Sequence, residues 1–183
     1  LSATIKSGTE NLTSTVYGVS EDYPAIKNLT VSDGRFISYI DAQDRHKVCV
    51  LGSYIANELF AGTSPVGETI KINGEAFTVV DVLSEKQGSS EGSEDDMLVI
   101  PYTCAVRMSQ NATISNYLFS ARDKDTVDAA KTQLELYLLG IFNSDSYYNV
   151  YNQADSLEEI NELTGTLTLV LVGIAAISLL VGG

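Results

Sequence analysis

The C-terminal end of the chain constrains its fold more than any other feature. From Leu163 to Gly183 the sequence carries no charged side chain and is mostly apolar, and the last charged residue is Glu162. A helix needs about 20 apolar residues to cross a bilayer. We therefore predict that Leu167 to Gly183 is a truncated transmembrane helix. A buried C-terminal helix of a globular domain is the alternative, but the glycines of this segment favour a membrane helix, where small residues lie at contacts.

The charges before this apolar segment predict its orientation. Glu158, Glu159 and Glu162 precede it, and the last Lys or Arg is Lys131. Cytoplasmic flanks of spanning helices carry an excess of Lys and Arg. We therefore expect residues 1–162 to lie outside the cytoplasm. The chain has neither an initiating Met nor a signal-peptide pattern at Leu1, so we expect any membrane or export signal to lie upstream in a longer protein.

Composition excludes several classes of function. The 183 residues hold 11 Lys and Arg against 24 Asp and Glu, a net charge of −13. Nucleic acid is therefore not an expected partner, because phosphate binding requires clustered Lys and Arg. The acidic run from Ser93 to Asp96 lacks the spacing and the glycine of a calcium loop. We expect no metal and no cofactor.

The reactive residues do not form a catalytic pattern. The one histidine, His46, lies between two basic residues before a predicted strand, which is typical of a solvated loop. No nucleophile elbow, zinc-binding helix or phosphate-binding glycine loop is present in the sequence. Cys49 and Cys104 lie in apolar stretches, which raise the pKa of a thiol. A disulfide between them and two buried free thiols both remain open. We expect no enzymatic activity.

Residue patterns predict alternating strands and helices. The Asn73-Gly74 pair between two alternating segments is a strong signal for a hairpin over residues 70–80. A helix over 123–139 is predicted to place Val127, Ala130, Leu134, Tyr137 and Leu138 on one face and to stop at Gly140. The other predicted strands are 3–7, 13–19, 29–31, 47–51, 97–100, 115–121 and 147–151, and the other predicted helices or turns are 20–27, 37–44, 53–60 and 101–108.

This order of elements predicts an α+β fold. A β-α-β unit at each end of the chain surrounds a middle section with its own strands and helices. The pattern indicates one small sandwich interrupted by an inserted α/β subdomain. After the sandwich, Leu157, Ile160 and Leu163 recur at helical spacing, which predicts a stalk helix that continues into the membrane segment. Leu157 and Ile160 are expected to face either a partner or the domain's own sheet.

An ordered series of short motifs between residues 34 and 101 supports this organisation. The series includes Gly34, Arg35, Phe36, Gly52, Leu59, Phe60, Pro65, Gly67, Gly74 and Pro101. It resembles the MacB-like core domain, the extracytoplasmic part of a family of four-helix ABC transporter permeases, well over residues 12–105. The run from Ile174 to Gly183 is similar to the start of the second membrane helix of FtsX-type permeases. Each motif residue also has a purely structural interpretation, as a turn glycine, a turn proline or a core side chain.

The resemblance implies four segments. Residues 1–33 and 112–154 would form a porter-like subdomain near the membrane, 34–111 an inserted outer subdomain, and 155–183 the stalk and membrane helix. The domain would couple cytoplasmic ATP hydrolysis to substrate export or handover by conformational change, at the bacterial cell membrane. Expected partners are a second permease copy, a cytoplasmic ATP-binding subunit or domain, and an extracytoplasmic adaptor. The alternative on composition alone is a ligand-binding or sensory ectodomain of a single-pass receptor.

Overall fold

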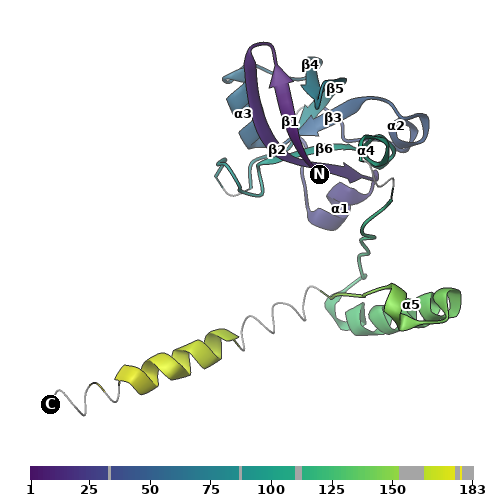
Figure 1. Cartoon of the computed structure of the whole chain (residues 1–183), viewed down its shortest axis with the longest axis vertical. Coiled ribbons are helices and arrows are strands. Elements are labelled where there is room, and N and C mark those ends of the chain that lie inside the picture. The colour runs from purple at the N-terminus through teal and green to yellow at the C-terminus, as the bar shows by residue number, and fades with distance from the viewer. Residues whose placement is uncertain (33, 87, 110–112, 153–162, 176–177, 179–183) are drawn as a thin grey trace. The chain divides into compact units, whose positions relative to one another are not determined.

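The computed structural model describes residues 1–183 except 33, 87, 110–112, 153–162, 176–177 and 179–183 (Figure 1). The chain divides into two compact units, Leu1–Phe119 and Ser120–Gly183. We call them the first and the second unit and describe each by itself.

The first unit is built on a closed barrel of six strands (Figure 1). Around the barrel the strands follow the order β1-β2-β6-β3-β5-β4. The pairs β2–β6 and β3–β5 are parallel and the other pairs are antiparallel. The strands are β1 (Ser2–Ser7), β2 (Glu10–Val19), β3 (Val48–Leu51), β4 (Thr69–Ile72), β5 (Glu75–Val82) and β6 (Met97–Pro101).

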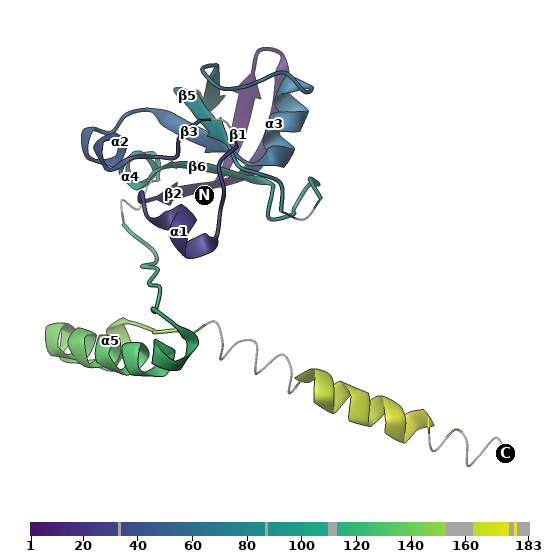
Figure 2. The ribbon, with the colours of Figure 1, turned by 180° about the vertical axis from the view of Figure 1, so that it is seen from behind.

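Three helices lie between these strands along the chain, and a fourth follows β6. They are α1 (Tyr23–Lys27), α2 (Tyr39–Asp44), α3 (Ser53–Phe60) and α4 (Tyr102–Met108). Figure 2, seen from behind, shows α3 beside β1, and α2 and α4 together at the opposite side of the barrel. The backbone carbonyl of Ala42 in α2 accepts a hydrogen bond of 2.7 Å from the hydroxyl of Thr103 in α4, which joins these two helices.

Strand β6 contributes to two apolar cores, which explains why all five of its residues are buried. Leu98 and Ile100 belong to the larger core, together with Phe77 and the side chains of α3. Met97 and Val99 point the other way and belong to the smaller core around Val19, Ile37, Val50 and Leu83. Successive side chains of a strand point to opposite faces of the sheet. A strand that packs against an apolar core on both faces therefore has an uninterrupted run of apolar residues in its sequence.

Most predicted elements of the first unit are confirmed. The hairpin of residues 70–80 is present as β4 and β5, and its turn has φ of 48° at Asn73 and 89° at Gly74. The predicted helix 53–60 coincides with α3. The predicted strand 29–31 is wrong, because among these residues only Val31 forms an isolated bridge, to Leu83.

The arrangement of the strands differs from the predicted sandwich with an insertion. The sequence predicts a subdomain boundary between residues 33 and 34, but β1 pairs with β4 and β2 pairs with β6 across that boundary. The strands of segments 1–33 and 34–111 therefore form one closed barrel. The α+β class is correct. The limits of segments 112–154 and 155–183 remain predictions.

The second unit contains helices but no strand among its described residues. It holds the 3₁₀ helices η1 (Lys124–Thr126) and η2 (Asp145–Tyr147), the helix α5 (Val127–Phe142), and a helix over residues 163–175. The predicted helix 123–139 is confirmed, but Gly140 lies inside α5, which ends where Asn143 adopts φ of 52°. The predicted strands 115–121 and 147–151 are wrong, since neither segment pairs with a strand in the described part of the chain.

The predicted membrane segment lies only partly within the described residues. It is helical up to residue 175, with exposed apolar side chains such as Leu169 and Leu171. No helix within the described ranges has the length and apolar character needed to cross a membrane. The predicted stalk residues Leu157 and Ile160 lie outside the described residues.

Candidate functional site

Two of the motif glycines lie where the backbone of another segment leaves no room for a side chain. A Cβ atom on Gly34 would lie 2.2 Å from the carbonyl oxygen of Val80, and a Cβ on Gly52 would lie 2.1 Å from the carbonyl oxygen of Asp95. Gly52 also donates its backbone N–H to the carbonyl of Met97 over 2.7 Å. These glycines therefore hold the loops before α2 and α3 directly against the barrel strands.

The loop that follows Gly34 leads into a buried charge cluster. The guanidinium of Arg35 donates two hydrogen bonds to the carboxylate of Asp41, one of them 3.1 Å long. The backbone N–H of Ser38 donates to the same carboxylate over 2.9 Å, and the Nδ1 atom of His46 lies 3.2 Å from its other oxygen. Asp41 is 2% exposed, whereas the side chains of Arg35 and His46 are each 52% exposed. The cluster thus has a buried anion whose partners Arg35 and His46 reach solvent.

The electrostatics of this cluster favour the ionised carboxylate. Burial by itself raises the pKa of Asp41, but hydrogen bonds from Arg35, Ser38 and His46 outweigh it and hold the pKa well below its ordinary value. The pKa of Arg35 is raised by the same hydrogen bond with Asp41. Because the carboxylate stays charged and fully engaged, the cluster fixes the loop and the first turn of α2. It is a positioning device rather than an acid or a base.

The remaining motif residues have structural roles. Gly67 has φ of 89° and donates its N–H to Val79, and Pro65 accepts a hydrogen bond from Glu68, so both shape the turn before β4. Pro101 ends β6 and precedes α4. Leu59 is buried in the larger core, while Phe60 and Phe36 are partly buried against the larger and the smaller core respectively.

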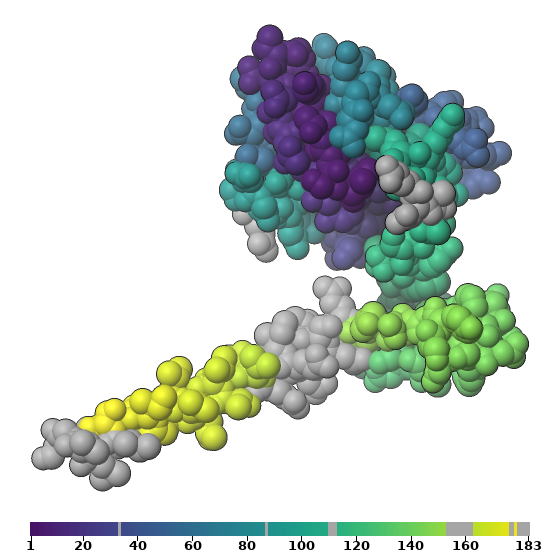
Figure 3. Space-filling view, in the orientation of Figure 1, coloured from purple at the N-terminus to yellow at the C-terminus, as the bar shows by residue number. Residues whose placement is uncertain are grey.

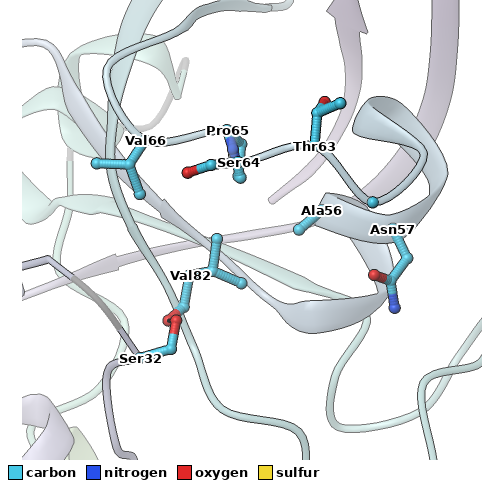
Figure 4. Close-up of a pocket in the computed structure, with 9 residues that line it drawn as sticks. Ser32, Ala56, Asn57, Thr63, Ser64, Pro65, Val66 and Val82 are labelled. Atoms are coloured by element: carbon cyan, nitrogen blue, oxygen red, sulfur yellow. Dashed lines mark hydrogen bonds between the residues drawn. The ribbon is translucent and has the colours of Figure 1, made fainter.

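A shallow hollow adjoins α3, and Pro65 is among its lining residues (Figure 4). Figure 4 shows the loop with Thr63, Ser64 and Val66 facing Ala56 of α3 and Val82 of β5. Its volume is about 320 Å³, and no lining residue is charged. A hollow of this kind can contact another molecule, but it supplies neither an acid, a base nor a strong ligand for a metal ion. The full lining is Ser32, Ala56, Asn57, Gly62, Thr63, Ser64, Pro65, Val66 and Val82.

Both cysteines are free thiols in this structure. Cys49 is fully buried in β3 and Cys104 is 7% exposed in α4. Burial raises the pKa of each thiol. Their sulfur atoms lie 3.6 Å from the backbone carbonyls of Thr78 and His46 respectively. The sequence leaves open a disulfide or two buried free thiols, and the structure shows the buried free thiols.

The second unit exposes a large apolar surface that the sequence patterns did not predict. No residue of α5 is buried, and of the predicted face only Val127, Leu134 and Leu138 are partly covered. Phe142 contacts the rings of Tyr147 and Tyr148. Clustered exposed apolar side chains mark contacts with other protein or with membrane. The exposed members are Leu136, Tyr137, Leu139, Ile141, Phe142, Tyr147 and Tyr151.

Sequence reasoning identified Arg35 as a motif residue but missed its partner. Asp41 is predicted only as part of the segment 37–44, and His46 only as a solvated residue. The available signal was the pattern Ser38-x-x-Asp41, which is a helix-capping sequence. In the structure Ser38 and Asp41 form a complete capping box at the start of α2. With this box in place the carboxylate of Asp41 is directed back toward Arg35.

A comparison with protein families identifies the family of this chain. The sequence model for the "MacB-like periplasmic core domain" matches residues 1–137. The macrolide export ATP-binding/permease protein MacB of Bdellovibrio bacteriovorus is 33% identical over 180 residues, covering 95% of this chain and 28% of that protein. The pyoverdine export ATP-binding/permease protein PvdT of Pseudomonas savastanoi is 34% identical over 185 residues, covering 99% of this chain and 28% of that protein. The chain thus spans little more than a quarter of these relatives.

Solved structures show the same fold. The periplasmic region of MacB from Actinobacillus actinomycetemcomitans aligns with a TM-score of 0.68 at 21% identity, covering 88% of this chain and 72% of that one. The extracellular domain of the noncanonic ABC-type transporter YknZ from Gram-positive bacteria aligns with a TM-score of 0.65 at 22% identity, covering 83% and 77%. At these identities the likeness concerns the fold alone.

Proposed function

Because this chain belongs to the family of MacB-like periplasmic core domains, we propose that it is the moving extracytoplasmic part of an ABC export permease. As a member of that family, it lies on the extracytoplasmic side of the bacterial membrane. In this proposal the domain couples ATP hydrolysis in the cytoplasm to the export or handover of a substrate. It does so by changing position and carries out no chemistry of its own.

The observation that carries this proposal is the alignment of nearly the whole chain with two named export permeases. The MacB and PvdT relatives are called ATP-binding/permease proteins, and this chain covers 28% of each. The ATP-binding part and the further membrane helices would then belong to the rest of a longer protein or to a separate subunit. The relatives are named for macrolide and pyoverdine export respectively, which are chemically different cargoes. We therefore assign export and leave its substrate class open.

The structure of the first unit suits a rigid moving part. Its strands close into one barrel with two apolar cores, and its buried carboxylate Asp41 is held by Arg35, Ser38 and His46. Packed protein interiors deform little, so a displacement applied to one end of the barrel moves all of it. We propose that the segment 155–162 transmits this displacement from the membrane helix.

The proposed partners follow from this arrangement. The exposed apolar side chains of α5 would contact a second permease copy or the rest of the polypeptide. Exposed apolar surfaces of this kind mark sites of contact with other protein or with membrane. A cytoplasmic ATP-binding subunit or domain supplies the free energy. An extracytoplasmic adaptor would receive the substrate.

Distance measurements between labelled copies test the proposal. The full-length protein with its ATP-binding part is placed in liposomes, with a spin label on a single cysteine at the exposed residues Lys71 on β4 or Asp128 on α5. Cys49 and Cys104 are buried and will take up little label, and the unsubstituted protein controls for them. We expect the distance between copies to change when ATP binds. An unchanged distance during ATP hydrolysis would show that the domain does not transmit motion.

A further inference from the structure

The turn between β4 and β5 carries a chemically labile dipeptide that the proposed function does not use. Asn73 is the only asparagine of the chain that is followed by glycine. In such a pair the backbone nitrogen of the glycine can attack the side-chain carbonyl carbon of the asparagine, because glycine has no Cβ to obstruct the approach. The side-chain nitrogen leaves as ammonia and takes up the proton of the glycine N–H. Water then opens the resulting cyclic imide to Asp or to isoAsp.

The turn is accessible to the reactants. Asn73 and Gly74 are both exposed. No heavy atom outside Gly74 and its chain neighbours lies within 4 Å of the place that a Cβ of Gly74 would occupy. In Figure 3 the purple surface that includes β1 adjoins the blue-green surface that includes β4, so the line where these two paired strands meet is open to solvent. Solvent exposure and free space therefore both permit the attack.

Two hydrogen bonds to β1 oppose the attack. The side-chain oxygen of Asn73 accepts the backbone N–H of Thr4 over 3.0 Å, and the backbone N–H of Asn73 donates to the carbonyl of Thr4 over 2.9 Å. For ring closure the side-chain carbonyl carbon must come within bonding distance of the nitrogen of Gly74, and this carbon carries the oxygen that Thr4 holds. The side chain of Asn73 must therefore leave Thr4 before it can react.

We propose that Asn73 is a site of spontaneous deamidation that is gated by the seam between β1 and β4. The seam consists of the pairs Ile5–Ile72 and Lys6–Lys71, whereas six residue pairs join β1 to β2. Strand β1 therefore separates from β4 more readily than from β2. While the seam is closed, Asn73 is retained. When the seam opens, the ring can close, and the change is permanent because the ammonia is lost to solvent.

The two products have different effects on the barrel. Asp at position 73 keeps an acceptor for the N–H of Thr4 and adds a negative charge. IsoAsp places an additional methylene group in the main chain, and a two-residue turn that fixes the register of its strands does not accommodate this. The isoAsp form therefore prevents the seam from closing again. This inference does not depend on the proposed export function, since it concerns the chemistry of the turn alone.

Peptide mass spectrometry of the aged full-length protein tests the proposal. The protein is kept in detergent at mildly alkaline pH and digested with trypsin, and a sample digested before ageing controls for deamidation during digestion. The tryptic peptide of residues 72–86 holds Asn73 as its one asparagine, and its Asp and isoAsp forms are separated by chromatography. We expect the folded protein to react about 30-fold more slowly than the same protein in guanidinium chloride, the effect of two hydrogen bonds. Equal rates, or no reaction of the unfolded protein, would overturn the proposal.

A matched pair of substitutions at Thr4 tests the hydrogen bond itself. Thr4→Pro removes the backbone N–H that the side chain of Asn73 accepts, whereas Thr4→Val keeps this N–H and alters only an exposed side chain. We expect Thr4→Pro to raise the rate of deamidation in the folded protein about fivefold, the effect of one hydrogen bond. Thr4→Val should leave the rate unchanged. Circular dichroism checks that both variants are folded, and equal rates in two folded variants would refute a role of this bond.

A second pair separates opening of the seam from unfolding of the whole barrel, and it serves even if Thr4→Pro does not fold. Ile5→Val and Ile100→Val remove the same group from the larger core, where both isoleucines are fully buried. Only Ile5 lies in a strand of the seam. We expect Ile5→Val to raise the rate about threefold and Ile100→Val to leave it unchanged. An equal rise in both variants would mean that Asn73 reacts only after global unfolding, which would refute gating by the seam.

Discussion

Thr4 and Asn73 exchange two hydrogen bonds although they lie 69 residues apart. The backbone N–H of Thr4 donates to the side-chain oxygen of Asn73 over 3.0 Å, and the backbone N–H of Asn73 donates to the carbonyl of Thr4 over 2.9 Å. Asn73 is the first residue of the turn between β4 and β5. These bonds continue the pairing of Ile5 with Ile72, and so they extend the seam between β1 and β4 that closes the barrel.

Replacing Asn73 should weaken this seam. Asn73→Ala removes the side-chain acceptor and puts a less suitable residue at φ of 48°. We expect the free energy of unfolding to fall by about 1–2 kcal/mol. Asn73→Asp keeps an acceptor and a residue that tolerates this conformation, and should cost less. Urea unfolding followed by circular dichroism measures both, and equal losses in the two variants would contradict the role of the side-chain bond.

Replacing Asp41 should cost more than replacing a surface acid of the same helix. Asp41→Asn loses the bidentate bond with Arg35 and weakens the capping box, so we expect about 2–3 kcal/mol less stability. Arg35 is half exposed and can be hydrated again, which keeps the loss below that of a fully buried pair. The control Asp44→Asn changes an exposed residue and should alter stability by no more than about 0.5 kcal/mol. Similar urea midpoints for both variants would refute a structural role of the cluster.

The contribution of Asp41 should disappear in acid. Its pKa in the folded chain is lowered, whereas an unfolded Asp titrates near 3.9. A lowered pKa stabilises the folded state fully above the unfolded pKa, and this stability is lost as the pH falls toward the folded pKa. The difference in unfolding free energy between the original chain and Asp41→Asn should therefore be constant above about pH 5 and shrink below about pH 4. If this difference in unfolding free energy grew as the pH fell, the lowered pKa of Asp41 would be refuted.

Alanine at the close-approach glycines should be poorly tolerated. A Cβ on Gly34 or Gly52 would overlap a backbone carbonyl oxygen that cannot move without displacing a strand or loop. We expect each substitution to lower stability by about 2–3 kcal/mol. Gly62→Ala is the matched control, since its φ of 86° disfavours Ala but no heavy atom lies within 4 Å of the added carbon. Gly62→Ala should lower stability by about 1 kcal/mol. Thermal unfolding should therefore show a larger fall in Tm for Gly34→Ala and Gly52→Ala than for Gly62→Ala.

The thiols should be unreactive while the chain is folded. Cys49 is fully buried, Cys104 nearly so, and burial raises the pKa of both, so little thiolate is present or accessible at pH 8. A disulfide-exchange reagent such as DTNB should label neither quickly without denaturant and both in urea. With single Cys→Ser variants, the rate for Cys104 should exceed that for Cys49. Rapid labelling of Cys49 in the native chain would mean that the barrel opens readily.

Local patterns were sufficient to predict the hairpin of β4 and β5, helix α3 and the buried strand β6, because each has a short-range signal. Asn73-Gly74 specifies its turn directly, and the apolar run at Met97 to Ile100 requires cover on both faces. The pairing of β1 with β4 has no such signal. It joins residues far apart in the sequence, and alternation alone does not say which strand is the neighbour. For that reason a sandwich was predicted where the chain forms a barrel.

The errors in the C-terminal part of the chain have a different cause. Residues 115–121 and 147–151 have the composition of strands, but a strand is stabilised by pairing, and no described strand lies beside either. Gly140 is a helix-breaking signal, yet α5 continues past it to Phe142 and is ended by Asn143, a residue type that also ends helices. Of the candidate site, Arg35 was predicted from the motif, whereas its bond with Asp41 depends on the direction of a side chain.

Closure of the barrel bears on how such domains behave when crowded together on a membrane surface. An open sheet presents unpaired backbone groups at its edges, which can recruit a strand from a neighbouring molecule and start aggregation. Each of the six strands of this barrel has a neighbour on both sides. Copies held at high density in two dimensions therefore lack the barrel edge that would let them polymerise.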